Sequence, residues 1–293
     1  MHDIVIKIIE SKLPFIEVFR RLKKHRLAVI GAAIILTLFF VAVFAPFIAP
    51  HDPIEQNLEN RLLSPNTEHP LGADNLGRCI LSRLIYGTRV SLQIGIMVVG
   101  ITVIIGVSLG LIAGYLGGLI DEMIMRSVDI LLAFPGIILA LAIAGILGPS
   151  LFNVMLALAV VGWTSYARVV RGSVLSVKEK EFVEAARALG ASDARIMFRH
   201  ILPNVMAPVI VMATLGMAHV ILAAAALSFL GLGAQPPTPE WGSMLNAGRA
   251  FMRTAPHLTI FPGLVIMVTV LAFNFLGDGL RDTLDPRLKG MIR

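Results

Sequence analysis

The polar side chains best suited to specific contacts lie in residues 184–203, EAARALGASDARIMFRHILP. Glu184, Arg187, Arg195 and Arg199 offer charge-assisted hydrogen bonds. Apolar runs long enough to enter a bilayer lie on both sides of this stretch, so it must face water. Its residue types therefore indicate docking against a soluble partner, not the making or breaking of bonds.

Catalytic chemistry finds little support elsewhere in the chain. The sequence has no G-x4-G-K-[ST] phosphate loop and no H-E-x-x-H zinc motif. Its one cysteine, Cys79, has no partner for an internal disulfide and no evident companions for a structural metal site. We therefore expect no catalytic residue, no cofactor and no metal.

The composition places the chain in a membrane. Hydrophobic residues make up 56% and charged residues 15% of its 293 positions, whereas a soluble domain has about a quarter charged. A helix needs roughly 20 apolar residues to cross a bilayer. We predict an all-α integral membrane protein with six transmembrane helices, at about 27–49, 91–115, 127–147, 151–170, 205–232 and 258–280.

The distribution of basic residues sets the expected orientation. With both termini in the cytoplasm, 19 of the 25 Lys and Arg residues fall on the cytoplasmic side, as the positive-inside rule requires. The net charge of +6 is thus explained without nucleic acid. The predicted organisation is a cytoplasmic tail (1–26), a first span (27–49), an extracytoplasmic loop (50–90), a helical core (91–280) and a second cytoplasmic tail (281–293).

Several residues in the spans stand out. Pro135 removes a backbone hydrogen bond and predicts a kink in the third span, which either lines a pathway or serves helix packing alone. His219 is the one ionisable group well inside the fifth span, so it either lines a pathway or bonds a neighbouring helix as a neutral side chain. Gly106, Gly110 and Gly114 have the spacing that lets helices pack closely in lipid. We expect that face to meet another helix.

The loop before the second span ends in residues 78–89, where apolar and basic side chains separate onto two helical faces. A short amphipathic helix in the membrane interface fits this pattern. An ordinary solvated helix fits it equally well.

Local signals give the polar stretch an angled shape. Residues 182–189 favour a helix, and Gly190 ends it in a left-handed turn. Ser192 or Asp193 can cap a second short helix that runs to about His200. Pro203 then opens the fifth span. The expected product is an L-shaped helix pair, with Ala185 and Ala186 leaving space for a partner surface to approach.

The spacing of Glu184-Ala185-Ala186, Gly190 and Leu202-Pro203 resembles the EAA loop of permeases in binding-protein-dependent ABC importers. His200 stands where isoleucine is usual. Residues 71–92, 228–245 and 272–287 narrow the resemblance to C-type subunits of the dipeptide, oligopeptide and nickel permeases. Cys79 departs from an aspartate that is more usual at its position. The resemblance covers about residues 20–290.

This resemblance implies a type I ABC importer permease, with a five-helix core preceded by one N-terminal span. It implies three kinds of partner: a homologous second permease, two cytoplasmic ATPases and an extracytoplasmic solute-binding protein. The loop at 171–203 would couple to the ATPases, and hydrolysis would belong to them. The coupling residues it implies are Glu184, Ala185, Ala186, Gly190, Ser192, Asp193, Arg195, Leu202 and Pro203.

Peptides are the favoured cargo, and nickel is the alternative within the same architecture. A bare nickel path would be expected to carry several His, Cys or Met ligands, yet only His219 lies deep in a span. A proton-coupled transporter would need ionisable residues at the midplane and usually repeats. A membrane-embedded enzyme would need paired catalytic residues within the spans. The sequence supports neither.

Overall fold

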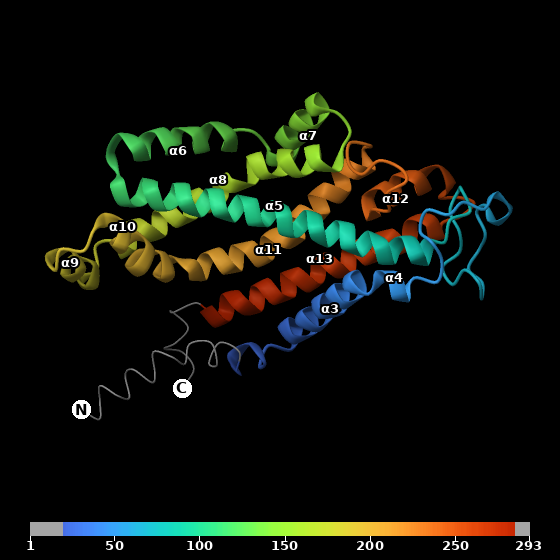
Figure 1. The fold of residues 1–293 in the computed structure, drawn as a ribbon, viewed down its shortest axis with the longest axis horizontal. Coiled ribbons are helices and arrows are strands. Elements are labelled where there is room, and N and C mark those ends of the chain that lie inside the picture. The colour runs from blue at the N-terminus through green and yellow to red at the C-terminus, as the bar shows by residue number, and fades with distance from the viewer. Residues whose placement is uncertain (1–19, 285–293) are drawn as a thin grey trace.

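Helices dominate the fold of residues 20–284, which are the residues that the structure, a computed structural model, describes (Figure 1). The predicted tails at 1–26 and 281–293 fall mostly outside this range. The elements are α3 (Arg26–Val43), α4 (Ala45–Ile48), η1 (Leu58–Asn60), α5 (Ile80–Leu116), α6 (Gly118–Leu132), α7 (Gly136–Leu147), α8 (Leu151–Val177), α9 (Glu181–Ala188), α10 (Asp193–Arg195), η2 (Ile196–Ile201), α11 (Leu202–Phe229), α12 (Trp241–Gly248), η3 (Arg249–Phe251) and α13 (His257–Leu284).

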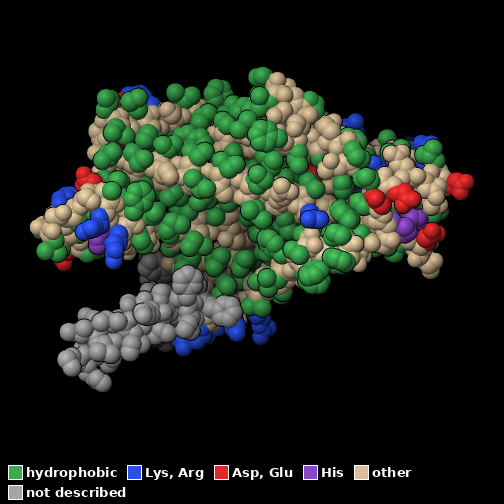
Figure 2. Space-filling model, in the orientation of Figure 1, with side chains coloured by type: hydrophobic (Ala, Val, Ile, Leu, Met, Phe, Trp, Pro, Cys, Tyr) green, Lys and Arg blue, Asp and Glu red, His purple; other side chains and the backbone are tan. Residues whose placement is uncertain are grey.

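Five continuous helical segments within residues 20–284 are long and apolar enough to cross a membrane. They are α3, α5, α8, α13 and the run Asp193–Phe229, which contains α11. Figure 2 shows the matching surface: hydrophobic side chains cover the flank, and charged side chains gather toward the two ends. The all-α membrane fold is confirmed.

The predicted third span is not one helix. Its place is taken by α6 and α7, which meet at an angle of 87°. Pro135 is the residue directly before α7 and has an extended ψ of 120°. Because proline restricts the residue before it and cannot donate a backbone N–H, it separates two helices here instead of kinking one. Counted as one broken span, the pair α6 and α7 brings the number of spans within residues 20–284 to the six predicted. The expected kink within one helix is a break between two helices.

Helix α6 lies against α8 through charged side chains. Arg171 of α8 donates from Nε and Nη2 to the two carboxylate oxygens of Asp121, at 2.5 and 2.6 Å. Arg168 of α8 pairs with Asp129 of α6. A bidentate Arg–carboxylate pair fixes geometry as well as charge. These residues therefore tie the amphipathic α6 to the long helix beside it.

The amphipathic segment at 78–89 is not a separate helix. It forms the first turns of α5, which runs without interruption from Ile80 to Leu116. Two of its three basic residues are buried and bonded within the protein. Arg83 Nη1 donates to the Pro53 carbonyl at 2.9 Å. Arg78 Nε donates to Asp74 at 2.7 Å. Neither alternative for this segment, an interfacial helix or a solvated one, describes what the structure has.

The glycines of the second span meet α8, as their spacing predicts. A Cβ on Gly106 would lie 2.5 Å from Tyr166 Cβ, and one on Gly110 would lie 2.5 Å from the Ala167 carbonyl oxygen. A Cβ on Gly114 would lie 2.8 Å from Val174 Cβ. Side chains of any size at these three positions would push the two helices apart. The expectation of a close helix contact along this face is confirmed.

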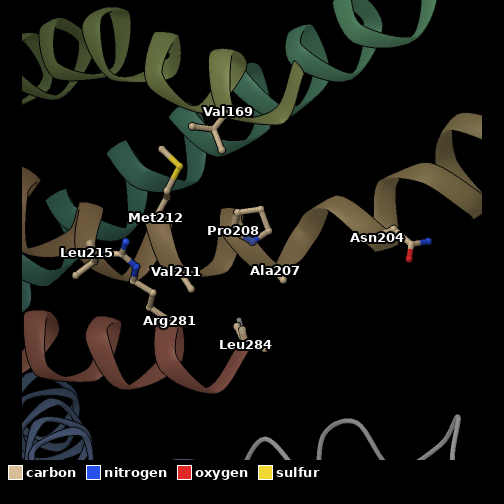
Figure 3. Close-up of a pocket in the computed structure, with 9 residues that line it drawn as sticks. All are labelled: Val169, Asn204, Ala207, Pro208, Val211, Met212, Leu215, Arg281 and Leu284. Carbon is tan, nitrogen blue, oxygen red and sulfur yellow. The ribbon is translucent and has the colours of Figure 1, made fainter. Parts of the chain in front are cut away.

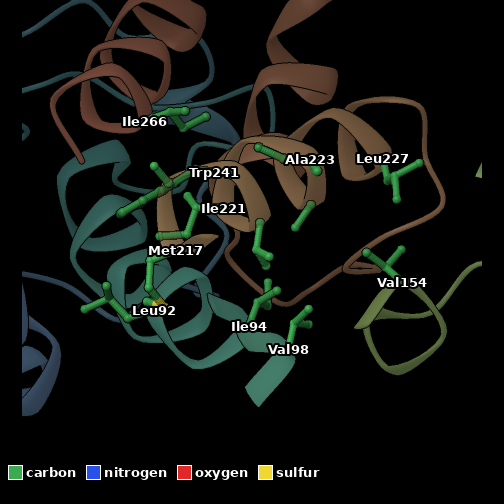
Figure 4. Packing of buried hydrophobic residues seen from close by; sticks show 14 of the residues in the cluster. Leu92, Ile94, Val98, Val154, Met217, Ile221, Ala223, Leu227, Trp241 and Ile266 are labelled. Atoms are coloured by element: carbon green, nitrogen blue, oxygen red, sulfur yellow. The ribbon is translucent and has the colours of Figure 1, made fainter. Parts of the chain in front are cut away.

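The main core lies where α5, α11, α12 and α13 converge (Figure 4). Trp241, at the start of α12, is fully buried and its indole N–H donates to the Leu84 carbonyl at 3.2 Å. Gly242 lets α12 approach α11, since a Cβ there would lie 2.2 Å from the Ala225 carbonyl oxygen. Ala223, Ala224 and Ala225 are buried at this crossing. The alanine run therefore packs tightly against its neighbours.

Candidate functional site

The predicted polar stretch forms an elbow, defined here as residues 181–201, at one end of the bundle (Figure 1). Its first arm is α9. Val183 and Ala186 are buried in a hydrophobic cluster with residues of η2, α8 and α11, whereas Glu184 and Ala185 are exposed. Only one of the two alanines therefore faces outward. The expectation that both leave room for a partner was wrong for Ala186, which fills an internal contact.

Gly190 makes the corner of the elbow. Its φ is +79°, which is the left-handed conformation that glycine adopts without a Cβ penalty. The Gly190 N–H bonds the Arg187 carbonyl at 3.0 Å, and the Ala191 N–H bonds the Ala186 carbonyl at 3.1 Å. This pair of bonds is a Schellman motif, which satisfies carbonyls that the end of α9 leaves free. The sharp turn predicted at this glycine is present.

The second arm begins at Ser192, whose Oγ accepts from the Arg195 N–H at 3.4 Å. The Ile196 N–H bonds the Ser192 carbonyl at 2.9 Å. Beyond α10 the chain continues as the π-helical η2 and then α11, so the second arm does not stop near His200. Pro203 lies inside this continuous run, with exposed side-chain surface. Movement of the elbow would therefore be carried directly into a membrane-spanning helix.

Two contacts hold the elbow and the end of α8 before it against the end of α5. The Tyr115 hydroxyl donates to Oδ1 of Asp193 at 2.5 Å. The Lys178 ammonium, just before α9, donates to the Gly114 carbonyl at 3.1 Å. The second arm is thus bonded to α5 directly, and the chain that leads into the first arm is bonded to the neighbouring residue of α5. No sequence pattern pointed to Tyr115, because nothing local relates it to a residue 78 positions away.

Large apolar side chains project from the elbow into solvent. Leu189 is 88% exposed and Phe198 is 63% exposed. Leu189 follows the last residue of α9, where the chain turns at Gly190, so it does not join the buried residues Val183 and Ala186. Apolar groups displayed among charged ones are typical of a protein-binding surface.

An open pocket of about 520 Å³ lies beside the base of the elbow (Figure 3). Val169 of α8, Pro208 and Met212 of α11, and Leu284 of α13 form part of its mostly apolar wall, and Arg281 adds a positive charge. One wall belongs to the helix that continues the elbow. Any rotation of that helix would change the shape of the pocket.

The two predicted pathway residues lie apart from the elbow. Pro135 is exposed between α6 and α7, and His219 is exposed on α11. Within residues 20–284, the His219 side chain forms no hydrogen bond to another helix of this chain. Neither residue belongs to a buried core cluster. The structure does not bring Pro135 and His219 to a common site.

One group of side chains could hold a metal, contrary to expectation. A nitrogen from His51, a nitrogen from His69 and Sγ of Cys79 all lie within 4.8 Å of one another. Spacing along the chain gave no sign of these companions for Cys79, because the histidines precede it by 10 and 28 positions. Folding of the loop before α5 brings them together.

A letter pattern of hydrolases also occurs in the chain, at residues 106–110, GVSLG, which fits G-x-S-x-G. These residues lie in the middle of α5. A nucleophile of this class needs a sharp strand-to-helix turn that exposes the serine. The pattern here belongs to helix packing.

The family model described as binding-protein-dependent transport system inner membrane component matches residues 106–290, which include the whole elbow. The chain belongs to this family. A second model, the N-terminal TM domain of oligopeptide transport permease C, matches residues 14–65. The chain is therefore a multi-pass inner membrane component of a binding-protein-dependent ABC importer. It is a transport subunit, and partner ATPases hydrolyse the ATP.

Curated relatives cover nearly the whole chain. The dipeptide transport system permease protein DppC of Alkalihalophilus pseudofirmus is 52% identical over 94% of this chain and 91% of its own length. The DppC of Haemophilus influenzae is 48% identical over 95% of this chain and 96% of its own. The glutathione transport system permease protein GsiD of Escherichia coli is 47% identical over 98% of this chain and 95% of its own length.

Among solved structures, a chain of the MetNI methionine ABC transporter, in inward-facing conformations, has a similar fold. The TM-score is 0.56 at 19% identity, covering 69% of this chain and 96% of that one. At this identity the likeness concerns the fold alone. It confirms the type I importer architecture expected for the permease core.

Proposed function

We propose that this permease imports short peptides and that the elbow is its contact with the ATPases. Relatives at 47–52% identity are named for dipeptide and glutathione transport, and both cargos are small peptides. This favours peptide import over the nickel alternative. The working importer pairs this chain with a homologous second permease, two ATPases and a solute-binding protein.

The observation that carries the coupling role is the shape and surface of the elbow. Its inner side is buried in the protein's own core through Val183, Ile196 and Ile201. Its outer side presents Leu189 and Phe198 among charged residues. An element that is rigid on one side and unpartnered on the other can transmit force from a bound partner. We assign the coupling role to Glu184, Ala185, Gly190, Ser192, Asp193 and Arg195. Ala186, Leu202 and Pro203 would hold the elbow in position for it.

A change at the contact and a change at the corner test this role. We expect Glu184→Lys to abolish peptide uptake by reversing a charge at the proposed contact. Gly190→Pro should do the same, because proline cannot adopt the φ of +79° found there. Membrane insertion of both variants, measured by fractionation, should be unchanged. Normal uptake in both variants would rule out the elbow as the coupling element.

Leu189 tests docking separately from coupling. Leu189→Ser removes an exposed apolar side chain and should leave the permease folded while reducing the amount of ATPase that copurifies with it. Leu189→Cys tests the orientation: a membrane-impermeant maleimide should label it in inside-out vesicles and not in right-side-out ones. The reverse labelling would place the elbow outside the cell and end the proposal.

Substrate identity has its own test. Vesicles containing the full importer should accumulate labelled dipeptide in an ATP-dependent way, and excess nickel should not compete. Competition by nickel salt with no effect of dipeptides would favour the nickel alternative. Uptake that survives ATP depletion would contradict an ATP-driven importer altogether.

A further inference from the structure

We propose that His51, His69 and Cys79 form a Zn²⁺ site in the distal loop, defined here as residues 50–79. This loop lies at the end of the molecule opposite the elbow (Figure 1). A ring nitrogen of each histidine and the Cys79 sulfur lie within 4.8 Å of one another. The two imidazole rings are 4.6 Å apart between centroids. The three side chains come from separate parts of the loop and meet at the start of α5.

Hydrogen bonds hold the backbone of each ligand in place. The His51 N–H donates to Ser82 Oγ of α5 at 3.0 Å. The His69 N–H donates to Asn66 Oδ1 at 2.7 Å. Cys79 pairs with Ala73 in an isolated antiparallel bridge and directly precedes α5. The site is therefore arranged before any ion arrives, which lowers the cost of binding.

Two buried nitrogens at the site need a partner. Nδ1 of His51 and Nδ1 of His69 are buried and form no hydrogen bond with the described residues. His69 is only 4% exposed. A buried polar atom without a partner is unfavourable, because it has lost its bonds to water without replacement, and such atoms are rare in folded proteins. A metal ion would satisfy these lone pairs.

The second nitrogen of His69 is already used. Its Nε2 lies 3.2 Å from the side-chain amide of Asn60. The structure places the amide nitrogen Nδ2 of Asn60 at this ring. A half-turn of the amide exchanges its nitrogen and oxygen. Nε2 then donates to the Asn60 oxygen, and Nδ1 keeps its lone pair for an ion. An outer hydrogen bond of this kind fixes the tautomer of metal-binding histidines. Asn60 thus supplies the support that a His69 ligand requires.

The donor set selects the class of ion. Two imidazoles and one thiolate suit Zn²⁺, whereas Mg²⁺ and Ca²⁺ prefer oxygen ligands. With ligand bonds of about 2.0–2.3 Å, tetrahedral ligand atoms lie roughly 3.5 Å apart. The ligand atoms of His51, His69 and Cys79 lie within 4.8 Å of one another. They would reach the tetrahedral spacing if each side chain moved by less than about 1 Å. Three protein ligands leave the fourth position to water, on the side of the half-exposed His51.

Binding replaces the proton of the Cys79 thiol with the ion, so one proton is released per Zn²⁺ bound. The bound ion would join both histidine segments of the loop to the first turn of α5. This role is separate from peptide transport, and it requires no movement of the metal across the membrane. It also differs from a nickel path, because the three ligands lie outside the described spanning helices.

The experiment measures metal binding to the purified full-length permease. The permease is first stripped of metal with a chelator and dialysed. In competition with a chromogenic chelator, we then expect it to bind one Zn²⁺ per chain. Affinity should fall as pH is lowered, because protons compete with the ion for the thiolate. Co²⁺ in place of Zn²⁺ should give a thiolate-to-cobalt charge-transfer band. Since the chain has one cysteine, that band can report only Cys79.

Variants decide whether the ion sits at these residues. Cys79→Ser should abolish the cobalt band and weaken Zn²⁺ binding by more than the roughly 10- to 100-fold typical of losing an outer-shell partner. His51→Gln should weaken binding similarly, and its half-exposed position makes it the variant to rely on if Cys79→Ser does not fold. His25→Gln is the matched control. His25 lies directly before α3, outside the distal loop, so this variant should bind Zn²⁺ as the unmodified protein does.

Two results would overturn the proposal. One is that the unmodified permease binds no more Zn²⁺ per chain than the Cys79→Ser and His51→Gln variants do. The other is a cobalt complex without a thiolate band. Neither result bears on peptide import, since no transport is measured. A permease that transports peptide but binds no Zn²⁺ would refute this inference and leave the proposed function intact.

Discussion

The Tyr115 hydroxyl, one residue before the end of α5, donates a 2.5 Å hydrogen bond to Asp193 on the far arm of the elbow. Residues 78 positions apart thereby join the glycine-rich helix to the element proposed to receive force from the ATPases. Bonds to a charged acceptor are shorter and stronger than neutral ones. The contact holds the elbow against a helix that packs closely on α8 through its glycines.

Tyr115→Phe should weaken this joint while leaving the fold intact. It removes one hydroxyl, and because Asp193 is exposed to solvent the loss should be about 1 kcal/mol. A loss of coupling of that size lowers uptake roughly 5-fold. Uptake and peptide-stimulated ATPase activity of the assembled importer measure it. Tyr86→Phe, in the same helix, is the control and should transport normally; equal activity of both variants would show that the bond is not used.

Gly190→Ala should destabilise the elbow through backbone conformation alone. A Cβ at Gly190 meets nothing within 4 Å, but φ is +79°, and the left-handed conformation costs a residue with a Cβ about 1–2 kcal/mol. Gly172, inside α8, also has open space around it and has no positive φ. We expect Gly172→Ala to be neutral or slightly stabilising in thermal unfolding. A similar effect at both positions would show that φ does not matter at the corner.

Gly110→Ala should loosen the contact between α5 and α8. The new Cβ would lie 2.5 Å from the Ala167 carbonyl oxygen and 2.9 Å from Val170 Cβ. Overpacking of this kind typically costs about 1–3 kcal/mol. A Cβ on Gly100, in the same helix, would meet nothing within 4 Å, so Gly100→Ala is the matched control. Thermal unfolding in detergent should separate the two, and equal Tm values would refute close packing at Gly110.

Glu240 should make stability depend on pH. Burial raises the pKa of this carboxyl, and hydrogen bonds from the Gly242 and Ser243 N–H groups oppose the rise. The native state therefore holds its proton to higher pH than the unfolded chain, whose pKa is near 4.5. This contribution to stability is full below that value and is lost as pH rises toward the native pKa.

The Glu240→Gln variant carries no such titration. The Tm of the unmodified protein should therefore fall relative to that of Glu240→Gln as pH rises above about 4.5. Each Tm is compared at the same pH and in the same detergent. A difference in Tm that stays constant across this range would show that the carboxyl does not titrate differently in the two states.

The sequence by itself determined the features that depend on local chemistry. Apolar length located the spans, because the bilayer sets the length of helix it needs. Gly190 identified the corner of the elbow, since only glycine enters that conformation freely. The spacing of Gly106, Gly110 and Gly114 indicated a close helix contact before any partner helix was known. Each signal lies within a few turns of chain.

The tertiary structure decided what depends on distant partners. It showed that Pro135 separates two helices, that residues 78–89 continue into α5, and that Ala186 faces inward. It also brought Tyr115 to Asp193, and His51 and His69 to Cys79. These outcomes depend on packing between segments that lie far apart in the chain. Local helix propensity does not depend on those distant segments, so only the tertiary structure shows which residues meet.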